Sequence, residues 1–243
     1  MKAIKRILAL ALFVAAPALV WASGAEMHLD KAPVDLNDKV SLQRGAKLFT
    51  SRCLACHSAA YMRYNRLADI GMSEEQIKKD LELPDDVKIG STMQAAMDAN
   101  SAKLAYGVVP PDLSVIARSR SPDWLYTYLR VFYVDSAAAT GWNNTAFPSV
   151  AMPHVMSDMQ GELHLKVENH DGHEVKKLEL VTPGSMKPAE YDAAVADLTN
   201  YLVFMSEPAK LVRYNLGFIV LGFLFVLLAL VYALKKEIWK DIH

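Results

Sequence analysis

The chain has 243 residues, a formal net charge of −1 at pH 7, and a hydrophobic fraction of 52%. That length allows one or two ordinary domains, and this composition excludes a disordered or collagen-like chain. Two cysteines are too few for a disulfide-rich scaffold, and the near-neutral charge gives no reason to expect a nucleic-acid partner.

The first 22 residues have the order of a secretory signal peptide. Lys2, Lys5 and Arg6 precede an apolar run that ends in small residues. We expect cleavage after Ala22, so that residues 1–22 are removed from the mature chain. An uncleaved N-terminal anchor is the alternative, although the apolar run is short for a bilayer span, which needs about 20 apolar residues.

The exported region, residues 23–213, is expected to begin with an extended leader that is followed by a helix over 41–56. The helix is indicated by apolar side chains at the i, i+4, i+7 and i+11 spacing of one helical face. These side chains are Leu42, Ala46, Phe49 and Cys53. Both cysteines of the chain therefore lie at the end of a predicted helix, in the pentapeptide Cys53-Leu54-Ala55-Cys56-His57.

This pentapeptide has the C-x-x-C-H pattern of a c-type haem attachment site. Two thiols at this spacing on a helical turn can each add to one vinyl group of a haem. The next residue, His57, then projects toward the iron from the same side. We therefore predict one covalently bound haem c, attached at Cys53 and Cys56 and ligated by His57. Attachment on the far side of a membrane is consistent with the export signal.

Two other uses of the cysteine pair are less consistent with the sequence. A zinc site needs further Cys or His ligands at a matching spacing, and the sequence contains no second cysteine pair. A thioredoxin-like dithiol oxidoreductase has its pair at the start of a helix that directly follows an apolar strand. Here a helical stripe precedes Cys53, so the sequence favours a haem site over both alternatives.

The next segments are predicted to be helical, with one interruption. Ser73 and Gln76 form the pattern of a capping box, which predicts a helix over 73–83. The pair Pro110-Pro111 excludes a helix and indicates a turn. A further helix is expected over 122–135.

Residues 136–153 are rich in Ala, Asn, Gly and Pro and are predicted to form a loop. The loop contains Met152 between flanking prolines, and a rigid loop can hold a thioether at an iron without a large ordering penalty. A methionine ligand raises the reduction potential of a haem, whereas a second histidine leaves it lower. The local residues leave two other candidates for the sixth ligand open, Met186 and His154.

Two elements are expected between this loop and the C-terminal apolar run. Partly alternating apolar residues in 162–181, interrupted by Asp171-Gly172, predict a β-hairpin with a D-G turn. A helix is expected to begin at Lys187 or Pro188 and to end before Pro208. Its apolar stripe consists of Tyr191, Val195, Leu198, Leu202 and Met205.

The run 214–234 is predicted to be a transmembrane helix, because it contains no charged residue and is flanked by Arg213 and by lysines. With an exported N-terminus, residues 23–213 are expected in the periplasm of a bacterial inner membrane and residues 235–243 in the cytoplasm. The exported region carries a net charge of −5. Such a charge suits a basic partner through electrostatic steering, or merely keeps the domain soluble.

Several segments of the sequence form a known combination: Arg44-Gly45, the C-x-x-C-H motif with Ser58, Tyr64-Asn65-Arg66-Leu67, Pro110-Pro111-Asp112-Leu113-Ser114, the FPSVAMP loop at 147–153 and the single C-terminal anchor. Together they resemble the cytochrome c1 family, the haem subunits of cytochrome bc1 (quinol:cytochrome c reductase) complexes. We therefore expect a mainly α fold, namely a cytochrome c-type haem domain with a small β-hairpin insertion and one C-terminal transmembrane helix.

The resemblance also implies roles for individual residues. It favours Met152 as the sixth ligand of the iron over the two alternatives. It implies that Arg118 pairs with a haem propionate, for which the bidentate guanidinium is suited. It further implies that Pro111 lines the haem pocket and that a carbonyl near it orients His57 through Nδ1–H.

A membrane-anchored electron carrier, rather than an enzyme in its own right, is the function that the resemblance implies. The electron is expected to arrive from a Rieske iron–sulfur protein and to leave to a soluble or anchored cytochrome c. The C-terminal helix is expected to contact cytochrome b and membrane lipid. The alternatives are a haem enzyme or ligand sensor with an open sixth site, and a thiol oxidoreductase.

Overall fold

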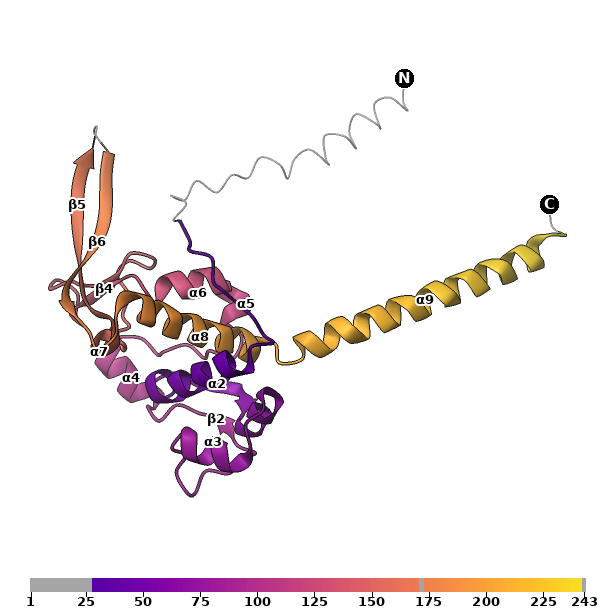
Figure 1. Ribbon diagram of the computed structural model, residues 1–243, viewed down its shortest axis with the longest axis horizontal. Helices are drawn as coiled ribbons and strands as arrows, with labels where there is room; N and C mark the ends of the chain where they lie inside the picture. Colours follow the sequence, from indigo (N-terminus) through magenta and orange to yellow (C-terminus); the bar gives the residue numbers. More distant parts are fainter. Residues whose placement is uncertain (1–27, 171–172, 242–243) are drawn as a thin grey trace.

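The computed structural model describes residues 28–170 and 173–241. This part of the chain is a helical body from which a two-stranded hairpin projects, while a long C-terminal helix leads away on another side (Figure 1). The elements are, in chain order, α2 (Lys39–Leu48), the π-helical turn η2 (Phe49–Cys53), β1 (Ala59–Arg63), the 3-10 helix η3 (Tyr64–Ile70), α3 (Glu74–Asp80), β2 (Thr92–Met93), α4 (Ala99–Tyr106), α5 (Ile116–Arg120), α6 (Pro122–Tyr128), β3 (Phe132–Val134), β4 (Trp142–Asn144), α7 (Ser157–Gln160), β5 (Gly161–His170), β6 (His173–Pro183), α8 (Pro188–Ser206) and α9 (Lys210–Trp239). The predicted signal peptide, residues 1–22, lies outside the described residues.

The first predicted helix begins two residues earlier than expected, at Lys39. Asp38 caps it, because its carboxylate accepts a hydrogen bond from the backbone N–H of Ser41 at 2.9 Å. The predicted apolar stripe is buried, which confirms the helical face expected from the sequence. Its members are Leu42, Ala46, Phe49 and Cys53.

The end of this helix differs from the prediction. The regular helix stops at Leu48, and one wider π-helical turn continues it to Cys53 instead of to residue 56. The backbone N–H groups of Cys56 and His57 then both donate to the carbonyl oxygen of Cys53, at 3.1 and 2.8 Å. The chain therefore leaves the helix at Cys53 in a tight turn, as a C-x-x-C pair at the end of a helix requires.

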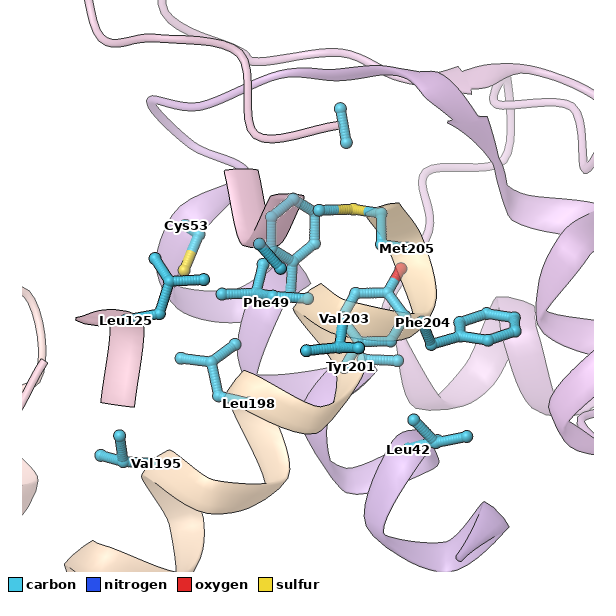
Figure 2. Packing of buried hydrophobic residues seen from close by; sticks show 14 of the residues in the cluster. Leu42, Phe49, Cys53, Leu125, Val195, Leu198, Tyr201, Val203, Phe204 and Met205 are labelled. Atoms are coloured by element: carbon cyan, nitrogen blue, oxygen red, sulfur yellow. The ribbon is translucent and has the colours of Figure 1, made fainter. Parts of the chain in front are cut away.

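Helices α2 and α8 cross at very close range. A Cβ atom on Gly45 would lie 2.1 Å from the backbone oxygen of Asp197 and 2.7 Å from the Cβ of Tyr201, so only glycine fits at this crossing. Arg44 stabilises the same contact, with Nε and Nη2 donating to the Asp197 carboxylate at 2.5 and 2.9 Å. Figure 2 shows Phe49 and residues of α8 packed together in the core beside this crossing.

Helix α8 confirms the prediction made from its apolar periodicity. It begins at Pro188, and Glu190 accepts a hydrogen bond from the backbone N–H of Lys187 at 2.9 Å. The predicted stripe is buried throughout, at Tyr191, Val195, Leu198, Leu202 and Met205.

The capping box predicted at Ser73 is present. Ser73 Oγ accepts from the backbone N–H of Gln76 at 3.2 Å, and the Gln76 side chain accepts from the backbone N–H of Ser73 at 2.8 Å. The helix that follows, α3, ends at Asp80, earlier than the predicted residue 83.

The prediction of one helix over 122–135 is wrong. Helix α6 ends at Tyr128, and residues Phe132–Val134 form strand β3. This strand pairs antiparallel with β4, which lies inside the segment predicted to be a loop. The run Phe132-Tyr133-Val134 is aromatic and β-branched, so pairing overrides the weak helical pattern once the partner strand is in place.

The predicted hairpin is confirmed as strands β5 and β6. The two strands pair antiparallel from Gly161 opposite Pro183 to His170 opposite His173, with one irregularity near the base. They extend away from the helical body (Figure 1). The predicted turn at Asp171-Gly172 lies outside the described residues.

The C-terminal apolar run forms part of helix α9. A short non-helical segment containing Pro208 separates α8 from α9, as predicted. The helix begins at Lys210, four residues before the predicted span, and it is long and apolar enough to cross a membrane. Its apolar side chains are exposed, because α9 leads away from the body (Figure 1). The described residues thus form a mainly helical fold with three small two-stranded sheets and one apolar C-terminal helix, which confirms the expected mainly α class.

Candidate haem site

One apolar cavity of about 470 Å³ lies in the helical body. Its walls include the end of η2 with the turn after it, the segment around Pro110-Pro111, helices α5 and α6, the loop 147–153, and α8. The predicted site residues Cys53, Cys56, His57, Pro111 and Met152 all line it. The structure therefore brings together residues that lie as far as 99 positions apart in the chain.

The two cysteines are at one wall of the cavity, and both are free thiols. Cys53 is buried, and its side chain points toward Leu125 of α6 and Leu198 of α8 (Figure 2). Burial raises the pKa of the Cys53 thiol to about 12. A catalytic dithiol needs a thiol whose pKa is lowered, so this environment is unlike that of a thiol oxidoreductase.

His57 is oriented by the chain itself. Its Nδ1 lies 2.8 Å from the carbonyl oxygen of Pro111, so the assigned tautomer has Nδ1–H donating and a lone pair on Nε2. Burial lowers the pKa of His57, and the hydrogen bond to Pro111 opposes this only in part. The imidazole is therefore neutral near pH 7, which is the form that binds a metal.

The segment that carries Pro111 is itself fixed by Asp112. The two carboxylate oxygens of Asp112 accept hydrogen bonds from the backbone N–H groups of Ala60 and Ser114, at 2.9 and 2.8 Å. Partial burial opposes ionisation of Asp112, but its hydrogen bonds to Ser114 and Ala60 outweigh that effect and lower its pKa. The carboxylate thus ties the proline pair to the strand that follows the haem motif.

Of the three candidates for the sixth ligand, Met152 alone is among the side chains that line the cavity. His154 is buried elsewhere, with its ring stacked on Phe132 at 5.0 Å between centroids and edge-on to Trp142 at 5.1 Å. Burial lowers the pKa of His154 to about 4. Met186 packs against the edge of the core outside the cavity lining.

The loop that carries Met152 is held by asparagines that the sequence analysis did not identify. Buried Asn144 donates to the carbonyl oxygen of Tyr128 at 2.8 Å and accepts from the backbone N–H groups of Ala146 and Phe147 at 2.8 and 3.2 Å. Asn143 accepts from the backbone N–H of Ser149 at 2.9 Å. The loop is therefore fastened to the end of α6 before it reaches Met152.

Two further side chains of the cavity were missed by sequence reasoning. The hydroxyl of Tyr128 donates a hydrogen bond to the sulfur of Met152 at 3.4 Å. Arg120 lines the cavity, and its guanidinium carbon lies 5.2 and 5.9 Å from the ring centroids of Trp124 and Phe147. Arg118, which the resemblance implied as the propionate partner, is exposed on α5 outside the cavity lining.

The donor set of the cavity fits a covalently attached haem. It offers two free thiols, a neutral imidazole, a thioether and apolar walls, and it has a cation near one side at Arg120. Among the described residues, no group of three or more His, Cys, Asp or Glu side chains is arranged to hold a metal ion on its own. In the part of the chain that the structure describes, there is therefore no set of side chains placed to bind zinc.

Comparisons with known proteins agree with this chemistry. A sequence model of the Cytochrome C1 family matches residues 29–242. The chain is 48% identical over 233 residues to cytochrome c1 of Allochromatium vinosum, with 94% of this chain and 95% of that protein covered. It is 53% identical over 228 residues to a Nitrosomonas europaea protein named ammonia monooxygenase gamma subunit, with 94% of both chains covered. It is 29% identical over 245 residues to cytochrome c1 of Rhodospirillum rubrum, with 84% and 83% covered.

Proposed function

Because the chain belongs to the cytochrome c1 family, we propose that it is a membrane-anchored c-type cytochrome that carries single electrons within a quinol:cytochrome c oxidoreductase complex. In this proposal it is an electron-transfer subunit of the complex and not an enzyme in its own right. The observation that carries the proposal is that one apolar cavity is lined by Cys53, Cys56, His57 and Met152 together.

One covalently bound haem c is the cofactor that suits this cavity. Cys53 and Cys56 would form the two thioether bonds, and His57 and Met152 would provide one nitrogen and one sulfur ligand. When bound, haem c supplies an iron that alternates between two oxidation states and so stores one electron.

The residues of the chain tune and protect that iron. The carbonyl of Pro111 holds His57 in the tautomer whose Nε2 lone pair is free for a metal. The thioether of Met152 raises the reduction potential above that of a bis-histidine site, and the apolar walls exclude water. We assign the propionate contact to Arg120 instead of Arg118, since Arg120 is the arginine that lines the cavity from α5.

The proposed electron path runs from a Rieske iron–sulfur protein to a soluble or anchored cytochrome c. Helix α9 would anchor the chain beside cytochrome b and membrane lipid, with the haem domain in the periplasm of a bacterial inner membrane and the last residues in the cytoplasm. The lysines that follow the apolar run support this orientation, because cytoplasmic flanks are enriched in basic residues.

The name of the Nitrosomonas europaea relative raises a second candidate complex. That protein is called a subunit of an ammonia monooxygenase, and its identity to this chain is as high as 53%. A haem with two axial ligands suits electron delivery in either complex. Purification of the tagged full-length chain from its native membranes distinguishes them: cytochrome b and a Rieske protein should co-purify, whereas co-purified monooxygenase subunits would contradict the proposal.

The direct test of the proposed cofactor uses the full-length protein from a host competent for haem attachment. On a denaturing gel, the protein should stain for haem peroxidase activity, and Cys53→Ala with Cys56→Ala should abolish the stain. A reduced-minus-oxidised spectrum should show a c-type haem. Free thiols in place of haem would overturn the proposal and support the thiol oxidoreductase alternative.

The ligand assignment predicts that Met152→Leu lowers the midpoint potential of the haem, because a thioether favours the reduced iron. The same change should let the reduced protein bind carbon monoxide, which the wild-type protein should bind poorly. Met186→Leu is the matched control and should change neither measurement. A wild-type protein that binds carbon monoxide readily would instead support the enzyme or ligand-sensor alternative.

A further inference from the structure

We infer that Tyr128 is a positioning residue for the Met152 thioether, and that the hydrogen bond from its hydroxyl to the Met152 sulfur would raise the reduction potential of the bound haem. The inference rests on the proposed function, because it takes Met152 as a ligand of the iron. It gives a residue of α6 a role at a site whose ligands the sequence motifs place in the C-x-x-C-H turn and the FPSVAMP loop.

The contact has the geometry of a hydrogen bond to sulfur. The Tyr128 oxygen lies 3.4 Å from the Met152 sulfur, and both side chains line the same cavity. A thioether sulfur has two lone pairs. One can be directed at a metal while the other accepts a hydrogen bond, so the two interactions do not exclude each other.

Three contacts hold Tyr128 in place. The Tyr128 ring is buried and stacks on Trp124, with 4.7 Å between centroids and 12° between planes. It lies edge-on to Phe132 at 5.1 Å, and its carbonyl oxygen accepts a hydrogen bond from Asn144 at 2.8 Å. A tyrosine hydroxyl is protonated at neutral pH and is therefore available as a donor.

The same asparagine joins the donor to the acceptor. Asn144 accepts from the backbone N–H groups at the start of the Met152 loop while it donates to Tyr128. The helix that carries the hydroxyl and the loop that carries the sulfur are therefore linked through one buried side chain. Such support from surrounding hydrogen bonds is what orients ligands at metal sites generally.

The expected effect on the potential follows from charge. A hydrogen bond draws electron density from the sulfur and weakens its donation to iron. The oxidised iron depends more on that donation than the reduced iron, so the bond favours the reduced state. Loss of one neutral hydrogen bond should shift the redox equilibrium about fivefold toward the oxidised form, or about 40 mV for a one-electron couple.

The test is Tyr128→Phe in the full-length, haem-loaded protein, with the midpoint potential measured by redox titration. The variant keeps the ring that packs on Trp124 and Phe132, and its potential should be lower than that of the wild type. Tyr126→Phe is the matched control on the same helix. Its ring lies under the Arg130 guanidinium, 4.4 Å from the guanidinium carbon to the centroid and outside the cavity lining, so its potential should be unchanged.

A double-mutant cycle separates a direct bond from a general packing effect. In the Met152→Leu background, Tyr128→Phe should no longer change the potential, because the acceptor is gone. A persisting shift in that background, an unchanged potential in Tyr128→Phe alone, or an equal shift in Tyr126→Phe would each overturn the inference. An unchanged potential in Met152→Leu alone would instead contradict the assignment of Met152 as a ligand. The experiment therefore distinguishes failure of the proposed ligand from failure of the role inferred for Tyr128.

Discussion

Arg118 and Arg120 lie two positions apart on α5 but in different surroundings. Both side chains are exposed, but Arg120 lines the cavity beside Trp124 and Phe147, whereas Arg118 is not among the residues that line it. A cation near the haem disfavours the oxidised state, in which the iron carries one more positive charge. Position on one short helix therefore decides which arginine can influence the potential.

Arg120→Gln should lower the midpoint potential, by at most about 1 kcal/mol in redox free energy, because the charge that is removed is exposed to solvent. Arg118→Gln is the matched control and should leave the potential close to that of the wild type. Redox titration of both variants at low and high salt checks the prediction, because screening should reduce the effect of an exposed charge. A larger shift in Arg118→Gln would restore the assignment implied by the resemblance.

The residues of the site that could be predicted from the sequence are those whose chemistry is local in the chain. Cys53, Cys56 and His57 share one pentapeptide, and Met152 lies between two prolines. Tyr128 gives no such signal, because an aromatic residue on a helix is usually a core residue. Tyr128 contacts Met152 only because α6 and the loop 147–153 pack together in the folded chain. No local sequence pattern indicates this packing.

At the scale of elements, the crossing of α2 and α8 depends on one glycine. A Cβ at position 45 would overlap the backbone of Asp197, and a helix backbone cannot yield as a flexible side chain can. Both helices also contribute to the cavity region, through Cys53 at the end of the first and through Leu198 and Leu202 of the second. A wider crossing would therefore disturb the site as well as the core.

Gly45→Ala should destabilise the protein by about 2–3 kcal/mol, as overpacking of a close helix contact does. A loss of stability would be informative, because replacing glycine by alanine in a helix interior normally increases stability. Thermal unfolding of the haem-loaded protein in detergent, followed by circular dichroism, checks this. Gly90→Ala is the control, since nothing lies within 4 Å of its added Cβ. Equal melting temperatures for the two variants would contradict the close crossing.

Elements with a strong periodic pattern were predictable, and elements that depend on a distant partner were not. The stripe from Tyr191 to Met205 correctly predicted α8, because buried apolar residues repeat at helical spacing along most of this 19-residue helix. The segment 122–135 was assigned to one helix, yet β3 forms because Trp142–Asn144 supplies a partner strand. The residues of β3 alone do not reveal that this later segment pairs with them, so the strand could not be predicted from its own sequence.

At the scale of the whole molecule, the cavity and the membrane helix are separate parts of one chain. Helix α9 leads away from the body (Figure 1), and no residue beyond Leu202 is among those that line the cavity. The apolar side chains of α9 are exposed, so the core of the body does not depend on them.

A chain that ends after Glu207 should therefore fold into a water-soluble haem protein. Its spectrum and midpoint potential should match those of the full-length protein in detergent, because every side chain lining the cavity is retained. Ultracentrifugation of the exported protein and redox titration provide the check. Material that stays with the membrane pellet, or that has an altered potential, would show that α9 contributes to the haem domain.

The three residues between α8 and α9, Glu207 to Ala209, have a consequence for how electrons travel. Such a linker spans at most about 11 Å when fully extended. Leu202 lines the cavity and lies about 6 Å along α8 from its last residue, Ser206. This short tether keeps the cavity close to the start of α9, so under the proposed function an electron donor and an electron acceptor would have to approach it there.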